Sequence, residues 1–467
     1  MSGRATLGWL GIVRLGLVQT SLGAIVVLTT STLNRVMVVE LALPAMLPGI
    51  LVGLHYGLQM LRPRWGYGSD HSRRRTPWII AGMAVLAAGG ALAAVATALM
   101  GTALAAGIAL AAVAFLLIGI GVGASGTSLL VMLAERVETG RRAAAATIVW
   151  IMMIAGFAVT ATVAGHFLDP YSPARLVAVT GTVSVIALAV TVLALWGVEA
   201  RFASASAPAA AAGDARAEPF LRTLATVWSE PQARAFTIFI FVSMLAYSAQ
   251  DLVLEPFAGT VFAMTPGEST RLGGLQNGGV LAGMVLVAIV GTTRLGRSEA
   301  LLRGFIVVGC LGSAAALAAL SLGGAAGAGF PLRPTVFALG FCNGVFAVAA
   351  IGAMMALAGG TGTGRRQGTR MGLWGAAQAV AFGLGGFLGT VAVDLARHLV
   401  GSPEIAYGAV FAAEAALFVV AAGLAVRVAT AAGAVDRRFR SATVRRHGFR
   451  SAPASGLATE FEGEMSR

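Results

Sequence analysis

The segment TLNRVMVVEL, from Thr32 to Leu41, ends the first long apolar run of the sequence. It places Asn34, Arg35 and Glu40 among Val, Leu and Met side chains. Polar and ionisable side chains at membrane depth are energetically costly, and they usually face a cavity or a partner. We therefore expect this segment to mark a functional position inside a membrane protein.

A second segment, AQDLVLEPF from Ala249 to Phe257, repeats the pattern about two hundred residues later. It carries Gln250, Asp251 and Glu255 within another apolar run. Because the two segments share an unusual combination of residues, we expect them to serve related roles.

Composition assigns the whole chain to the membrane class. The chain has 467 residues, of which 57% are hydrophobic and only 11% are charged, and its mean hydropathy is +0.83. An ordinary globular protein contains about 25% charged residues. The net charge of +13 comes from arginine alone, without the aromatic-rich basic domain that stacks bases, so nucleic-acid binding is not expected.

Apolar segments of about 20 residues are long enough to cross a bilayer as helices. The sequence therefore predicts an all-α polytopic membrane protein with twelve transmembrane helices. We place them near residues 11–36, 41–61, 78–99, 103–133, 144–168, 174–198, 234–262, 272–293, 300–321, 334–357, 371–397 and 405–428.

The distribution of arginine predicts the orientation in the membrane. Connections that follow even-numbered helices carry two to five arginines each, whereas connections that follow odd-numbered helices carry about one. Arginine-rich loops are retained in the cytoplasm. We therefore expect both the N-terminus and the C-terminus to be cytoplasmic.

The chain is predicted to divide into two bundles. The segment ASASAPAAAAGDARAEP has the composition of a flexible linker. We expect an N-terminal six-helix bundle at 1–200, a cytoplasmic linker at 201–233, a C-terminal six-helix bundle at 234–428, and a disordered cytoplasmic tail at 429–467.

An internal repeat supports two pseudo-symmetric halves. A shift of 224 residues aligns Thr139-Gly140-Arg141-Arg142 with Thr363-Gly364-Arg365-Arg366 and pairs Trp150 with Trp374. Two similar halves that both start on the same side fit parallel repeats about an axis normal to the membrane, with the functional site at their interface.

One loop resembles a known motif. The sequence GYGSDHSRRR, residues 66–75, resembles the loop between the second and third helices of the major facilitator superfamily. By that resemblance, Asp70 pairs with arginine side chains and forms a cytoplasmic latch with Arg73, Arg74 and Arg75.

The two opening segments narrow this resemblance. TLNRVMVVEL in the first helix and QDLVLEPF in the seventh are similar to the PucC-type branch of that superfamily, also called the bacteriochlorophyll delivery family. The resemblance implies a light-harvesting antenna assembly factor of purple phototrophic bacteria, in the inner (intracytoplasmic) membrane. Such a protein binds bacteriochlorophyll and delivers it to nascent antenna polypeptides of LH1 or LH2.

The resemblance also implies partners: the lipid bilayer, the antenna polypeptides and pigment-synthesis enzymes. The sequence contains no catalytic triad or phosphate-binding loop, so we do not expect an enzyme. The alternative is a secondary transporter of a small solute, proton-coupled through Glu40, Asp251 or Glu255.

His55 is a candidate ligand for the magnesium of bacteriochlorophyll. It lies well inside an apolar span, with Tyr56 and Gln59 beside it. Magnesium prefers oxygen ligands, so Asn34, Gln250 or a bridging water are rivals. The simpler alternative is a hydrogen-bonded packing residue.

The charged side chains are expected to interact between the halves. Arg35 and Glu40 would lie about 140° apart on an α-helix, so we do not expect them to pair with each other. Asp251 and Glu255 share a helix face. We expect Arg35 to pair with one of them, either as an inter-half gate or pigment-carbonyl site or as a structural ion pair.

Overall fold

The computed structural model describes residues 6–61, 74–138, 141–199, 228–292, 299–359 and 367–448, and throughout these ranges the regular structure is helical. The first half comprises α1 (Trp9–Val27), η1 (Leu28–Thr32), α2 (Leu33–Arg35), η2 (Val36–Glu40), α3 (Met46–Gln59), α5 (Thr76–Met100), α6 (Leu104–Arg136), α7 (Arg142–Leu168) and α8 (Pro173–Leu195). The second half comprises α10 (Pro231–Phe262), α11 (Pro266–Thr292), α12 (Glu299–Ala326), η6 (Gly327–Gly329), α13 (Leu332–Gly359), α14 (Gln367–Val400) and α15 (Pro403–Gly448).

Eleven helices of the described chain are long and apolar enough to cross a membrane. The second predicted span, 41–61, corresponds to α3, which has 14 residues. It starts late because Ala42 adopts a positive φ of 51°, which ends the preceding helix. The prediction of an all-helical multi-pass protein is confirmed.

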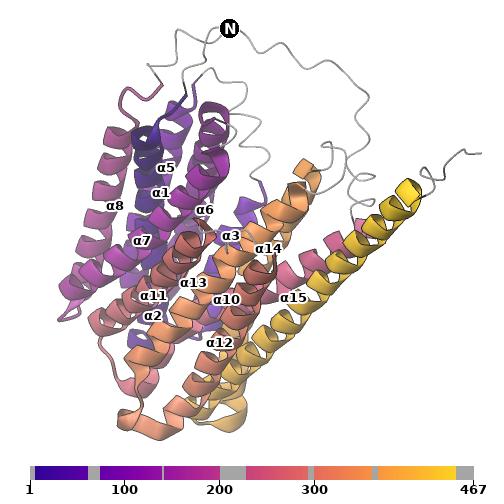
Figure 1. Cartoon of the computed structure of the whole chain (residues 1–467). Helices are drawn as coiled ribbons and strands as arrows, with labels where there is room; N and C mark the ends of the chain where they lie inside the picture. The colour runs from indigo at the N-terminus through magenta and orange to yellow at the C-terminus, as the bar shows by residue number, and fades with distance from the viewer. Residues whose placement is uncertain are drawn as a thin grey trace, which may run out of the picture.

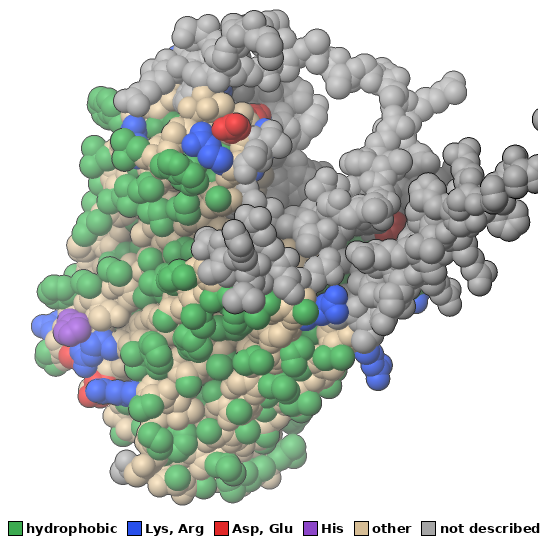
Figure 2. Space-filling view, in the orientation of Figure 1, with side chains coloured by type: hydrophobic (Ala, Val, Ile, Leu, Met, Phe, Trp, Pro, Cys, Tyr) green, Lys and Arg blue, Asp and Glu red, His purple; other side chains and the backbone are tan. Residues whose placement is uncertain are grey.

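The two halves lie side by side, with the first half in indigo to magenta and the second in pink through orange to yellow (Figure 1). Each half has its own large cluster of buried hydrophobic side chains. Between the ends, the visible surface is mostly hydrophobic, and its charged side chains gather in a few groups (Figure 2). Apolar side chains cover the outside because the solvent there is lipid. Most of the predicted linker, 201–227, lies outside the described residues.

Small residues allow helices to approach closely in the second half. A Cβ atom at Gly340 or Gly344 of α13 would overlap the backbone carbonyl of Gln276 or Val280 on α11. Lipid tails provide no hydrophobic driving force between helices, so close backbone packing takes its place.

The last helix is longer than predicted. We expected a disordered tail from residue 429, but α15 continues as a helix to Gly448 (Figure 1). Alanine and arginine both have high helix propensity, which favours extension of the helix beyond its apolar part.

The halves meet along three sets of helices. α7 packs against α11, α3 packs against α14, and α10 packs against the segment from η1 to η2. We call the end of the bundle where α1 begins and α6 finishes the near end, because Leu7 bonds there to Arg136. The opposite end, where α10 connects to α11, is the far end.

Candidate functional site

A cavity of about 310 Å³ lies between the halves. This volume is at the lower end of the range for small-molecule pockets, about 300 to 1,000 Å³. Its walls are mostly apolar and come from α1, η1, α3, α6 and α7 of the first half and from α10, α11, α13 and α14 of the second. Five of the lining side chains are aromatic: Tyr56, Trp150, Phe157, Tyr247 and Phe382.

Two carboxylates reach the cavity from one helix. Asp251 and Glu255 lie one turn apart on α10, and both line the cavity. Glu255 is 2% exposed, and neither of its carboxylate oxygens has a hydrogen-bond partner. Its position depends on Gly273 of α11, because a Cβ there would lie 2.5 Å from Glu255 Oε1. The cavity therefore contains an acidic group that can accept hydrogen bonds from a ligand.

His55 and Gln59 also line the cavity, from α3. His55 Nε2 and Gln59 Nε2 are 2.9 Å apart and hydrogen-bonded, and the His55 ring packs edge-on against Tyr56 with ring centroids 4.8 Å apart. His55 is only 1% exposed. Ligation of magnesium through Nε2 would require the bond to Gln59 to break, so this role stays a prediction.

Asn34 joins the halves and does not line the cavity. It is fully buried, and its side-chain Nδ2 donates to the backbone carbonyl of Leu252 on α10 at 2.7 Å. That carbonyl lacks its usual intrahelical donor, because the residue four positions later is Pro256, which has no N–H group. The Asn34 side chain therefore supplies the hydrogen bond that Pro256 removes.

Arg35 and Glu40 form an ion pair, contrary to our expectation. The reason is local geometry: Val36–Glu40 is a π-helix, in which residues five apart bond and lie on one face. Burial raises the pKa of the Tyr171 hydroxyl in the α7–α8 connection, and the Glu40 carboxylate adds to this rise. Tyr171 therefore lies within electrostatic range of the pair.

The predicted pairing of Arg35 with Asp251 or Glu255 is wrong in this conformation. Arg35 Nη2 instead donates to the carbonyl of Met264, just after α10, at 2.6 Å. Arg35 interacts with Glu255 only electrostatically. The arginine does cross between the halves, but its hydrogen bond to the second half goes to a backbone carbonyl rather than to a carboxylate.

Gln250 is the remaining candidate of the second segment. It is fully buried on α10 and is not among the residues that line the cavity. Neither its side-chain oxygen nor its nitrogen has a hydrogen-bond partner.

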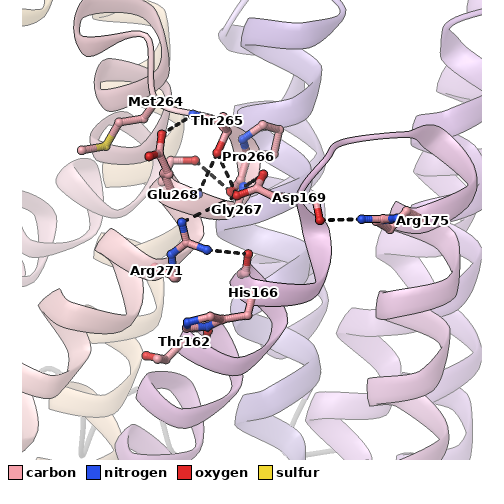
Figure 3. Close-up of polar contacts among 12 residues, drawn as sticks. Thr162, His166, Asp169, Arg175, Met264, Thr265, Pro266, Gly267, Glu268 and Arg271 are labelled. Carbon is pink, nitrogen blue, oxygen red and sulfur yellow. Dashed lines mark hydrogen bonds and ion pairs between the residues drawn. The ribbon is translucent and has the colours of Figure 1, made fainter.

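Sequence reasoning missed a group of inter-half contacts at the far end, shown in Figure 3. Asp169, which follows α7, accepts hydrogen bonds from Thr265 Oγ1 at 3.0 Å and from the backbone N–H of Gly267 at 3.1 Å. Its carboxylate also lies 3.6 Å from the Arg271 guanidinium, and Arg271 Nη1 donates to the carbonyl of Gly165. Asp169 thus binds the N-terminus of α11, where a negative charge is favourable.

A second carboxylate, on the other side of the interface, also binds the N-terminus of a helix in the opposite half. Asp394 of α14 accepts hydrogen bonds from the backbone N–H groups of Ala45 and Met46, at 2.9 and 2.7 Å. These groups start α3, so each half caps a helix of the other half. The internal repeat could have predicted this pair of contacts, because the shift of 224 residues places Asp169 one position from Asp394, so that the two aspartates have nearly equivalent positions in the two halves.

The predicted latch is only partly within the described chain. Asp70 and Arg73 lie outside the described residues, whereas Arg74 and Arg75 lie just before α5. Arg75 bonds to Glu135 at the near end of α6, 2.8 Å away, so this contact stays within the first half.

The chain is similar to known proteins over most of its length. A family model described as "PUCC protein" matches residues 32–433. The chain is 57% identical over 430 residues to a Rhodobacter capsulatus protein named "Bacteriochlorophyll synthase 44.5 kDa chain", covering 92% of this chain and 97% of that protein. It is 30% identical over 442 residues to "Protein PucC" of the same organism, covering 89% and 91%.

Solved structures share the fold. The nucleoside transporter NupG has a TM-score of 0.61 at 13% identity, covering 90% of this chain and 98% of that chain. A bacterial homologue of the lysosomal transporter Spinster, inward-facing and occupied, has a TM-score of 0.64 at 15% identity, covering 90% and 96%. The predicted major facilitator architecture of two six-helix halves is confirmed.

One expectation is overturned by these comparisons. We expected that the chain is not an enzyme, because its sequence shows no catalytic motif. The R. capsulatus relative is named as a chain of a bacteriochlorophyll synthase, so the expectation that an enzyme is excluded is not kept.

Proposed function

Because the chain belongs to the PUCC protein family, we propose that it handles bacteriochlorophyll in the membrane of a phototrophic bacterium. It works with the pigment-synthesis machinery, binds the pigment in the cavity between its halves, and delivers it to nascent antenna polypeptides of LH1 or LH2. It resides in the inner membrane with both termini in the cytoplasm. Its two bundles, at 1–200 and 234–428, are joined by a cytoplasmic linker.

The observation that carries this proposal is the 57% identity to the bacteriochlorophyll synthase chain, which extends over 92% of this chain. Similarity of that extent supports a common fold for the two proteins and a related role in the membrane.

The cavity has the chemistry that a chlorophyll-type ligand requires. A large flat ring packs well against aromatic and aliphatic side chains. Its carbonyl groups can accept hydrogen bonds from the amide side chains of Gln59, Asn277 and Gln378, which line the cavity from three helices. A pocket with mostly apolar walls and a few polar groups is typical of small-molecule sites.

The proposal is tested by purifying the protein from a pigment-making host and from a pigment-deficient host. We expect the absorbance spectrum of bacteriochlorophyll in the first preparation only, and loss of antenna complexes when the gene is deleted. If no pigment copurifies and antenna assembly survives deletion, the proposal fails. Accumulation of a water-soluble solute by proteoliposomes would favour the transporter alternative.

A pair of glycine variants makes this test specific for the cavity. Gly375 lines the cavity, and a Cβ there meets nothing within 4 Å, so Gly375→Phe places a ring in the open space. Gly181 of α8 is equally uncrowded but does not line the cavity, which makes Gly181→Phe the matched control. We expect copurified pigment to fall several-fold in the first variant and to stay unchanged in the second.

A further inference from the structure

A groove opens at the far end, where the start of α3 meets the end of α14. Its lining residues lie between positions 42 and 46 in the first half and between 391 and 398 in the second. No described residue lines both this groove and the cavity between the halves. The groove is therefore a separate site, and the proposed function assigns nothing to it.

The charged side chains that line the groove favour an anion. Asp394 is already engaged, because both of its carboxylate oxygens accept hydrogen bonds from backbone N–H groups at the start of α3. Arg397 is half-buried and His398 is exposed, and neither side chain has a hydrogen-bond or ion-pair partner in the described part of the chain. A guanidinium binds two phosphate oxygens at once, and an imidazole always has at least one N–H group to donate. The groove therefore offers unused donors for a phosphate.

Two rows of exposed apolar side chains extend from the groove along the contact between the helices. Met46 and Ile50 form the row on α3, and Leu384 and Leu395 form the row on α14; all four are between 41% and 59% exposed. Spacings of four and eleven residues keep each row on one face of its helix. Met46 and Leu395 both line the groove, so the two rows start on the same side of the contact.

The rows have the length of one lipid leaflet. The eleven residues from Leu384 to Leu395 span about 16 Å at about 1.5 Å per residue. Half of the hydrocarbon core of a bilayer is about 15 Å thick. The row on α3 follows the same course, because the backbone of Gly49 lies directly against Thr390 of α14. A ligand with its anionic group in the groove can therefore place a hydrocarbon chain along both rows.

We propose that this groove binds an anionic phospholipid from the leaflet at the far end. Its phosphate contacts Arg397 and His398, and one acyl chain lies along the rows on α3 and α14. A free phosphate would use the donors but leave the apolar rows uncovered, and a zwitterionic lipid would bring a cation that competes with Arg397. Because α3 and α14 belong to different halves, the bound lipid bridges the halves beside the helix cap that Asp394 forms.

Native mass spectrometry of the delipidated full chain tests the head group. The protein is titrated with phosphatidylglycerol and with phosphatidylcholine of the same acyl chains. We expect the first phosphatidylglycerol to bind at least tenfold more tightly, and Arg397→Gln to remove this preference. Arg333→Gln is the matched control, because Arg333 is an exposed arginine at the far end of α13 and does not line the groove. Equal binding of the two lipids, or an equal loss in both variants, would overturn the proposal.

A glycine variant tests the position of the acyl chain. Gly53 is seven residues after Met46 and shares its face of α3, and a Cβ there meets nothing within 4 Å. We expect Gly53→Phe to lower the affinity for phosphatidylglycerol several-fold, whereas Gly181→Phe, equally uncrowded on α8 and outside the groove, leaves it unchanged. An unchanged affinity in a folded Gly53→Phe protein would contradict this position. Displacement of the lipid by millimolar inorganic phosphate would show a site for soluble anions and overturn the proposal.

Discussion

At the scale of single residues, Asn34 and Pro256 explain why the two polar segments belong together. Proline in a helix leaves a carbonyl without a donor, and an unsatisfied buried polar group costs about 1 to 3 kcal/mol. The Asn34 amide satisfies the Leu252 carbonyl across the interface between the halves. The two segments are therefore one hydrogen-bonded unit.

This coupling is measurable in a double-mutant cycle. Asn34→Leu removes the donor and should lower the free energy of unfolding by about 1 to 3 kcal/mol. Pro256→Ala restores an intrahelical donor to the Leu252 carbonyl. We therefore expect Asn34→Leu to lower the free energy of unfolding by less in the Pro256→Ala background than in the wild-type chain. The measurement is reversible denaturation in detergent followed by circular dichroism. Strictly additive losses would show that the two residues act independently.

The Arg35–Glu40 pair makes a second prediction at this scale. Glu40→Gln leaves the buried Arg35 guanidinium without its counter-charge, and we expect a loss of stability of about 1 to 3 kcal/mol in the same denaturation experiment. Glu138→Gln is the control, since Glu138 pairs with Arg141 while 65% exposed. Exposed pairs contribute at most about 1 kcal/mol. Equal losses would show that burial of Arg35 is unimportant.

At the scale of elements, the first helix owes its polar face to two π-helical turns, Leu28–Thr32 and Val36–Glu40. These turns change which residues share a face, and they bring Thr32 Oγ1 to 3.2 Å from Thr270 Oγ1 of α11. π-Helical turns are rare and are frequently found at functional sites. The segment makes its inter-half contacts along these turns and the short α2 between them.

The packing of α11 against α13 makes a prediction about small residues. Gly340→Ala places a methyl group onto the Gln276 carbonyl, so the helices must separate. We expect a clear fall in the midpoint temperature of unfolding in detergent. Gly304→Ala on α12 is the control, because its Cβ would meet nothing within 4 Å and alanine favours a helix. A similar fall in both variants would argue against close packing as the cause.

At the scale of the whole molecule, two carboxylates of the described chain join the halves at one end. Asp169 and Asp394 each cap a helix of the opposite half at the far end. The cavity lies on the near-end side of these contacts and extends to Trp150 and Gly375, each about two turns from the near end of its helix. The two caps therefore stabilise a conformation that is closed at the far end.

Removal of both caps should open that end. We expect Ser31→Cys, at the deep part of the cavity, to resist a membrane-impermeant thiol reagent applied from the far side. Asp169→Asn with Asp394→Asn should make this cysteine reactive from that side. Glu404→Gln is the control, because Glu404 is a far-end carboxylate that bonds to Ser402 within its own half. Unchanged labelling in the double variant would show that the caps do not control access.

The sequence by itself determined the class of the molecule and its helices. A long apolar segment in a bilayer must form its backbone hydrogen bonds internally, as an α-helix does. Composition and segment length therefore indicate where the transmembrane helices lie. The sequence also identified Asp251, Glu255, His55 and Gln59, which all line the cavity, because polar groups within apolar runs stand out.

Only the tertiary structure decided what the opening segment does. Asn34 and Arg35 bind backbone carbonyls of the other half, and backbone acceptors leave no signature in a sequence. The pairing of Arg35 with Glu40 depends on a π-helical turn, whereas spacing arguments assume 3.6 residues per turn. The contacts of Asp169 and Asp394 join residues 96 to 349 positions apart. Such partners are fixed by how the two halves pack, which local patterns do not encode.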